Sequence, residues 1–209
     1  MKNSEKFNTP QGQIGFILHK GGTYDPQTNT IKGGEILAQK EVKNLIVETA
    51  SVLMARRLAP GDNATSPAPS IPYEAISGLK YLAVGVGLLE DPGSAYDPVS
   101  NPVSSAWNLQ NPTEEKITDT KLVGELFRKE FTSWSFLDED LPVSTPTNVL
   151  RLVTTFDTNE ATGPLTEMGL FGGDATTAKD SGIMFNYKTF AVWNKPADSQ
   201  LTVTWKLTF

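Results

Sequence analysis

Side chains that commonly perform catalysis are scarce in this sequence. Its 209 residues contain one histidine and no cysteine, which excludes disulfides, thiolate metal sites and cysteine nucleophiles. A Ser-His-Asp triad would need His19, which lies between Leu18 and Lys20 in a run that reads as a strand, and no nucleophile motif accompanies it. We therefore interpret His19 as a strand residue near the surface and not as a catalytic base.

Two acidic segments partly match the pattern of a cation-binding loop. Residues 157–163, followed by Glu167, carry carboxylates and a glycine as an EF-hand loop does, but Ala161 occupies a ligand position and Gly163 comes one residue late. We therefore predict a turn between strands at this place. The run Asp138-Glu139-Asp140 could hold a hard cation or face a glycan, although adjacent acids are more typical of a solvated loop.

Two glycine-containing segments also fall short of a catalytic motif. The Ser77-x-x-Lys80 spacing occurs in serine hydrolases, but Gly78 breaks the helix that this motif needs, so we predict entry into a strand. Residues 85–87 lack the third glycine and the helix that bind a pyrophosphate. No glycosidase carboxylate pair can be selected among the acids. The sequence therefore predicts a non-enzyme, with no catalytic residue, no cofactor and no metal.

Four residues are the candidates for contacts with other molecules. Tyr96 and Trp107 lie in a long loop, residues 90–115, rich in Pro, Ser, Asn and Asp. Their rings could stack on a sugar or anchor the loop against a neighbouring subunit. Leu45 and Val52 lie on the apolar stripe of an expected helix, where they would contact another copy of the chain.

Hydrophobic periodicity predicts the elements of the N-terminal part. Residues 14–18 alternate as a strand and are followed by turn residues at 21–26, which together predict an extended arm or a hairpin. Residues 35–58 predict an amphipathic α-helix, which ends at Pro60-Gly61. The stripe of this helix consists of Val42, Leu45, Ile46, Thr49, Val52 and Leu53. The proline-rich residues 59–72 predict an irregular connector.

The rest of the chain reads mostly as strands. Residues 79–87 predict a buried strand, and Asp119 could cap a short second helix through Phe127. Residues 131–136 and 149–156 alternate in the manner of strands. The C-terminal residues 200–209 alternate most clearly, with one apolar face and one wet face. The apolar face consists of Leu201, Val203, Trp205, Leu207 and Phe209.

These elements predict a mainly β protein, an antiparallel β-sandwich or barrel-like fold with an N-terminal amphipathic α-helix and a short second helix. We divide the chain into an attachment and oligomerisation part (1–58), a connector (59–78) and a β-sandwich body (79–209). The net charge of −6 and the pI near 4.9 argue against a nucleic-acid partner. No stretch approaches the ~20 apolar residues of a membrane span, and no secretory signal is expected at the N-terminus.

Three stretches together resemble a broad group of phage virion proteins. They are the strand 78–87, ending in Ala-Val-Gly-Val-Gly, the segment 122–128, and the tail formed by 163–171 and 201–209. In these stretches the chain is similar to tail-fibre-like and collar-type virion structural proteins. The resemblance implies a homo-oligomer, often a trimer, that joins other virion proteins at the tail, baseplate or neck/collar of a virion assembled in the host cytoplasm.

The leading hypothesis is therefore an oligomeric adaptor or attachment brick of a phage virion. The alternative is a carbohydrate- or host-receptor-binding module that takes a host surface glycan through aromatic and acidic loop residues. A hydrolase of cell-surface polymer ranks third, because it requires a carboxylate pair that the sequence does not identify.

Overall fold

The computed structural model describes residues 11–47, 77–87 and 114–209. Several expectations fall on the other residues and so lie outside the described part. They are the second half of the expected N-terminal helix with Val52, the proline-rich connector, and the long loop with Tyr96 and Trp107. Among the described residues, no helix has the length and apolar character to cross a membrane.

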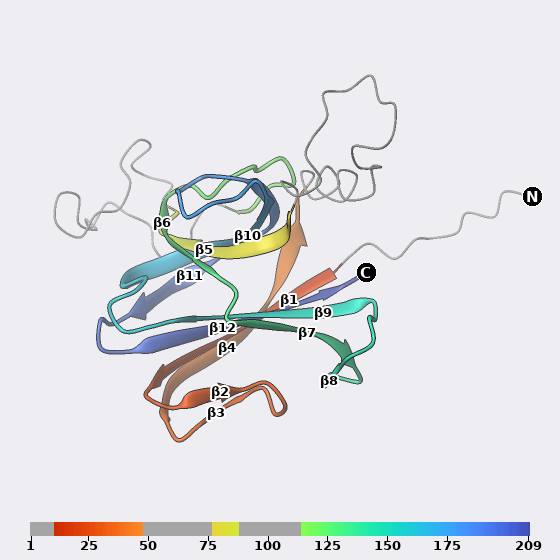
Figure 1. The fold of residues 1–209 in the computed structure, drawn as a ribbon. Helices are drawn as coiled ribbons and strands as arrows, with labels where there is room; N and C mark the ends of the chain where they lie inside the picture. Colours follow the sequence, from red (N-terminus) through yellow and green to blue (C-terminus); the bar gives the residue numbers. More distant parts are fainter. Residues whose placement is uncertain (1–10, 48–76, 88–113) are drawn as a thin grey trace, which may run out of the picture.

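The described chain is mainly β and antiparallel, and its strands form two facing layers (Figure 1). The first layer has the order β4-β1-β12-β9-β7-β8. Its strands are β1 (Gln11–Lys20), β4 (Glu35–Ile46), β7 (Ser133–Asp138), β8 (Leu141–Val143), β9 (Val149–Phe156) and β12 (Gln200–Thr208). The order ends at an open edge, β8, so this layer does not close into a barrel within the described residues.

The second layer has the order β6-β5-β10-β11. Its strands are β5 (Ser77–Gly85), β6 (Glu125–Glu130), β10 (Gly163–Gly173) and β11 (Ile183–Lys195). A separate hairpin consists of β2 (Thr23–Asp25) and β3 (Thr30–Lys32). The two-layer, sandwich-like arrangement agrees with the fold class that the alternating segments predict.

Strand β4 connects the two layers and corrects the expected N-terminal helix. Its residues 35–44 pair with β1, and Leu45 and Ile46 pair with β11. The helix prediction was wrong for residues 35–46, although Ala, Gln, Lys and Glu in this segment favour helix. Strand β1 pairs with β12 on one side and needs a partner on the other, and that pairing overrides local propensity.

The prediction of a second helix was also wrong: residues 119–124 are irregular, and β6 begins at Glu125. Leu122 is buried on the outer face of the second layer, whereas Phe127 packs against the core between the layers. The two side chains thus lie on opposite faces of the sheet, which a single helical stripe does not allow. Gly124 explains the difference, because its backbone meets β5 closely: the Val86 amide donates to its carbonyl oxygen at 2.9 Å.

The main core lies between the two layers and confirms the expected strands at 79–87, 149–156 and 200–209. Residues from both layers contribute, and Phe16 on β1 contacts Phe190 on β11 with ring centroids 5.2 Å apart. From the apolar face of β12, Leu201, Val203, Trp205 and Leu207 are all buried in this core. The other face of β12 was expected to be wet, but Thr202 and Thr204 are buried there. The β2–β3 hairpin and the β7–β8 ribbon lie over this outer face, and together with it they form the candidate site.

Candidate functional site

A polar pocket of about 240 Å³ lies on the outer face of the first layer. Strands β1, β4, β9 and β12 form its floor. The floor residues are Gln13, Gly15, Glu41, Arg151, Thr204 and Lys206. Asn29 from the β2–β3 hairpin and Leu137 and Asp140 from the β7–β8 ribbon complete the lining. These side chains come from segments far apart in the sequence, so only the fold brings them together.

Strand register explains why the basic residues share the floor. Lys206 on β12 is the direct cross-strand partner of Arg151 on β9 and of Gln13 on β1. One step along, Gly15 lies opposite Thr204. Outward residues repeat every second position along a strand, so all five share one face. Because Gly15 has no side chain, it leaves free volume above the centre of the floor.

The β2–β3 hairpin forms one wall, and Asp25 fixes its turn. The Asp25 carboxylate accepts hydrogen bonds from the Gln27 amide at 2.9 Å and the Thr28 hydroxyl at 2.8 Å, and it pairs with Lys32 at 2.6 Å. The Lys32 ammonium, followed by the two hydrogen bonds, lowers the pKa of Asp25 to about 2. The turn therefore holds its charge throughout the neutral range.

The same hairpin is attached to the sheet by polar contacts. The Tyr24 hydroxyl donates to Asn29 Oδ1 at 2.9 Å, and Thr204 Oγ1 lies 3.4 Å from the same oxygen. Arg151 Nη2 donates to the Pro26 carbonyl oxygen at 2.6 Å. Burial raises the pKa of the Tyr24 hydroxyl, against the opposing effect of the Arg151 cation. Tyr24 is therefore a neutral donor beside the pocket.

The β7–β8 turn forms a second wall. Glu139 and Asp140 both have positive φ, 45° and 68°, which matches a two-residue hairpin turn. The acidic run 138–140 is thus the exposed loop that its sequence predicts. Asp140 also has a role that the sequence did not indicate, because its carboxylate accepts from Lys206 Nζ at 2.6 Å.

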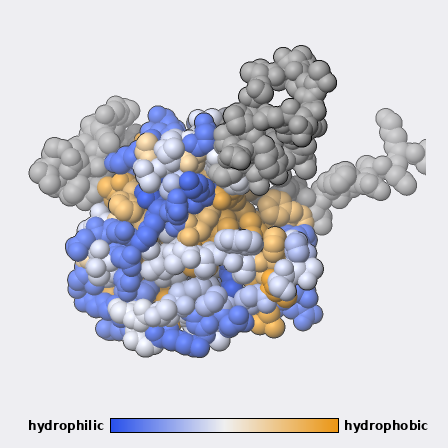
Figure 2. Space-filling model, viewed as in Figure 1, coloured by the Kyte–Doolittle hydropathy of each residue, from blue (hydrophilic) through white to orange (hydrophobic). Residues whose placement is uncertain are grey.

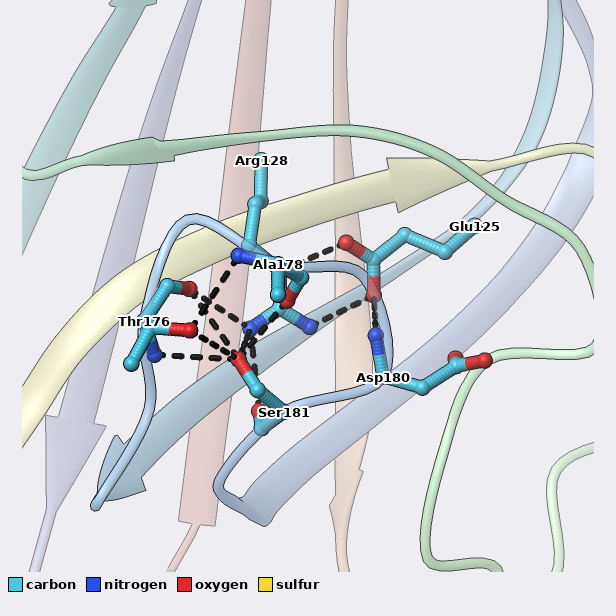
Figure 3. Close-up of polar contacts among 6 residues, drawn as sticks. All are labelled: Glu125, Arg128, Thr176, Ala178, Asp180 and Ser181. Carbon is cyan, nitrogen blue, oxygen red and sulfur yellow. Dashed lines mark hydrogen bonds and ion pairs between the residues drawn. The ribbon is translucent and has the colours of Figure 1, made fainter.

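The second layer contains a buried arginine whose charge is fully matched (Figure 3). Arg128 and Glu125 form a two-point ion pair at 2.5 and 2.6 Å. Arg128 Nη1 also donates to the carbonyl oxygens of Thr176 at 3.2 Å and Ser181 at 2.9 Å, and its guanidinium lies 4.6 Å from the centre of the Phe171 ring. This cluster attaches the β10–β11 loop to the sheet and is a structural element.

Arg151 is buried to the same degree but lacks such compensation. Its side chain is 3% exposed, and Nη2 has the Pro26 carbonyl oxygen as acceptor. Its Nε is buried without a hydrogen-bond partner. Within the described ranges, no carboxylate forms an ion pair with Arg151. A desolvated cation without a counter-ion is costly, which makes Arg151 the chemically distinctive residue of the pocket.

Glu167, the other buried acid among the described residues, holds a segment on the outer face of the second layer. Its carboxylate accepts from the amides of Val123 at 3.0 Å and Gly124 at 2.7 Å and from the Tyr187 hydroxyl at 2.6 Å. Burial raises the pKa of Glu167 above its usual value. All these donors come from the protein, so this carboxylate serves to fix the segment before β6.

The acids of residues 157–163 and the histidine are also held by contacts within the protein. Residues 157–163 form the expected turn between β9 and β10, and Asp157 and Glu160 both bind Lys129. His19 lies in a strand as expected, but it is 1% exposed and not near the surface. Its Nδ1 contacts the Gly21 carbonyl oxygen at 2.7 Å and its Nε2 contacts Thr202 Oγ1 at 3.0 Å. Ser77 and Lys80 lie in β5, as the expected strand entry requires.

Of the four contact residues proposed from sequence, only Leu45 falls within the described residues. Leu45 belongs to β4 and pairs with Tyr187, while Val52, Tyr96 and Trp107 lie outside the described residues. Sequence reasoning missed Arg151 and Lys206. The available signal was a single basic residue at an outward position in each of two strands, but nothing in the sequence indicates that these strands are neighbours.

Comparisons of the chain with models of protein families, with curated proteins and with solved structures find no match. The relation to phage virion proteins therefore stays a proposal. The described structure has two features suited to contacts with other molecules, the polar pocket and the open edge of the first layer.

Proposed function

We propose that the chain is a non-enzymatic structural component of a phage virion, acting as an oligomeric adaptor or attachment brick in a tail fibre, baseplate or neck/collar. The observation that carries the proposal is an apolar face at the open edge of the first layer. The resemblance of the strand 78–87 and the tail 201–209 to virion structural proteins supports its place in a virion.

This face belongs to the β7–β8 ribbon and consists of Trp134, Phe136, Leu141 and Val143. Trp134 pairs with Leu152 and Phe136 with Leu150, so both point to the core side of the layer. Yet Trp134 is 63% exposed and Leu141 59%. Figure 2 shows hydrophobic surface at the position of β8 in Figure 1.

The ribbon is exposed because it extends past the second layer. The last strand of that layer, β6, lies over β9, where Phe127 and Phe156 meet with ring centroids 6.0 Å apart. Strands β7 and β8 lie beyond β9 in the order of the first layer. An apolar face at a sheet edge is a typical site of contact between chains. We therefore assign the β7–β8 face to contact between copies of the chain.

The mass of the purified chain, measured by light scattering, tests this proposal. A specific interface between copies should bury ~1,200 Å² or more. The wild type should be an oligomer, and Trp134→Ser with Leu141→Ser should dissociate it. Ile117→Ser with Val123→Ser is the matched control, since these side chains are 51% and 57% exposed elsewhere. A monomeric wild type, or an oligomer unaffected by the first pair, would contradict the proposal. Mass spectrometry of purified particles tests its place in a virion.

A second candidate function, a carbohydrate- or host-receptor-binding module, is favoured by the polar pocket. The pocket offers amide, hydroxyl, carboxylate and basic groups on a rigid sheet, which is a suitable set for a polyhydroxylated ligand. A glycan array on the purified chain tests this function directly. Glycan binding that survives in the double variant Trp134→Ser with Leu141→Ser would place the glycan site away from the β7–β8 face.

A further inference from the structure

We infer that the polar pocket binds a sugar that bears a carboxylate, and that the Arg151 guanidinium is its anion subsite. This inference rests on the second candidate function and specifies its ligand class. The two buried arginines of the described chain differ in their partners. Arg128 has a two-point partner in Glu125, whereas Arg151 has one acceptor in the part of the chain that the structure describes, the Pro26 carbonyl oxygen.

The acids of the pocket do not neutralise Arg151. The Asp140 carboxylate is 2.6 Å from Lys206 Nζ and is paired with it. The Glu41 carboxylate accepts from the Gln13 side-chain amide at 3.1 Å, at an exposed position. Both acids are solvated, so water screens them, while Arg151 is desolvated. A ligand carboxylate in the pocket would supply the missing counter-charge and could accept hydrogen bonds from the guanidinium.

The charges of the lining favour a carboxylate over a phosphate. Arg151 and Lys206 are balanced in number by Glu41 and Asp140. One added negative charge meets the unpaired guanidinium, but a second would face the two carboxylates without a further cation. A phosphate monoester carries nearly two negative charges at neutral pH. The pocket is therefore better matched to a single carboxylate.

The rest of the lining favours a sugar as the carrier of that carboxylate. Gln13, Asn29 and Thr204 offer amide and hydroxyl groups, and Glu41 offers acceptors for ligand hydroxyls. The volume of about 240 Å³ has room for about eight waters at ~30 Å³ each, which is enough for one pyranose ring. Gly15 provides the free volume at the centre of the floor.

Calorimetric titration of the full chain with three probes tests the inference. The probes are methyl β-D-glucuronide, methyl β-D-glucoside and glucose 6-phosphate. We expect the glucuronide to bind at least tenfold more tightly than the glucoside, since a charge-assisted hydrogen bond separates them. We also expect it to bind more tightly than the phosphate.

Two variants locate the site. Arg151→Gln should remove the preference for the glucuronide over the glucoside. Because Arg151 also holds the hairpin, Gly15→Val provides an independent test. A Cβ at Gly15 meets nothing closer than 3.9 Å, so this variant should fold and fill the pocket, which abolishes binding of the glucuronide. Lys80→Gln and Gly78→Val, on the second layer, are the matched controls and should bind as the wild type does.

The outcomes separate this inference from the function on which it rests. Equal binding of the glucuronide and the glucoside, both lost in Gly15→Val, would overturn the carboxylate inference and leave sugar binding standing. Tighter binding of the phosphate would overturn it as well. If none of the probes binds, or if Gly15→Val binds the glucuronide normally, both the ligand class and the pocket are wrong.

Discussion

Arg151 and Lys206 are direct cross-strand neighbours on β9 and β12, but of the two only Lys206 has a carboxylate partner among the described residues. The difference follows from position. Lys206 is 33% exposed and reaches the β7–β8 turn, whereas Arg151 is covered by the β2–β3 hairpin, to which it donates a hydrogen bond. Lys206 thus fixes the β7–β8 wall of the pocket, whereas Arg151 has no carboxylate partner among the described residues.

The matched arginine gives the first stability prediction. Arg128→Met leaves the Glu125 carboxylate buried without its cation, and such a change typically costs about 3 to 5 kcal/mol. We expect the free energy of unfolding, measured in urea, to fall by about this amount. Lys80→Met is the control, because its ion pair with Glu130 joins side chains that are 44% and 61% exposed; it should cost below ~1 kcal/mol. Equal losses for the two variants would contradict the structural role of the Arg128 cluster.

The close approach of the segment before β6 to β5 gives the second prediction. A Cβ at Gly124 would lie 2.6 Å from the Val86 carbonyl oxygen, so Gly124→Ala must displace backbone. We expect a loss of about 1 to 3 kcal/mol in the free energy of unfolding. Gly78→Ala has nothing within 4 Å of its new Cβ and should be neutral or slightly stabilising. Wild-type stability of Gly124→Ala would show that this contact is absent.

Strands with a clear alternating pattern could be predicted from the sequence. Residues 149–156 and 200–209 were correctly expected as strands, because an alternating pattern is a local property. The segment 35–46 was not, because its partner β1 is set by the tertiary fold. Local helix propensity contains no information about the pairing of this segment with β1.

The candidate site was harder to predict than the fold. His19 and the acidic turns stand out by residue type. His19 and the turn at 157–163 are held by contacts within the protein, whereas Asp140 of the run 138–140 lines the pocket. Arg151 and Lys206 are ordinary residues in their own segments. Their place in the pocket depends on the register of β9 against β12 and on burial by the β2–β3 hairpin. Neither can be predicted from a single sequence.

Glu167 gives a prediction about pH. Burial raises the pKa of this carboxyl in the folded chain above its ordinary value. Its contribution to stability is then fully present below the unfolded pKa and is lost as pH rises through the folded pKa. Relative to Glu167→Gln, the wild type should lose free energy of unfolding as pH rises above 4.5, the ordinary pKa of a glutamate. Glu130→Gln, at a side chain that is 61% exposed, is the control. A stability difference between the wild type and Glu167→Gln that does not change with pH would refute the assignment.

Asp25 gives the opposite pH dependence in the hairpin. Its pKa is lowered to about 2 in the fold, from 3.8, so its contribution is present above 3.8 and is lost as pH falls through about 2. The Gln27 amide, which donates to Asp25, should report this in NMR spectra as a shift with a midpoint near 2. Asp25→Asn should remove the transition, whereas a wild-type midpoint near the ordinary value of about 4 would show that the turn is not formed as described.

Hydrogen exchange of residues 133–143, followed by mass spectrometry above and below the dissociation concentration, tests the central claim most directly. If the β7–β8 face joins copies of the chain, these amides should exchange more slowly in the oligomer, while β5 exchanges alike in both states. An oligomer that leaves the exchange of residues 133–143 unchanged would contradict the account.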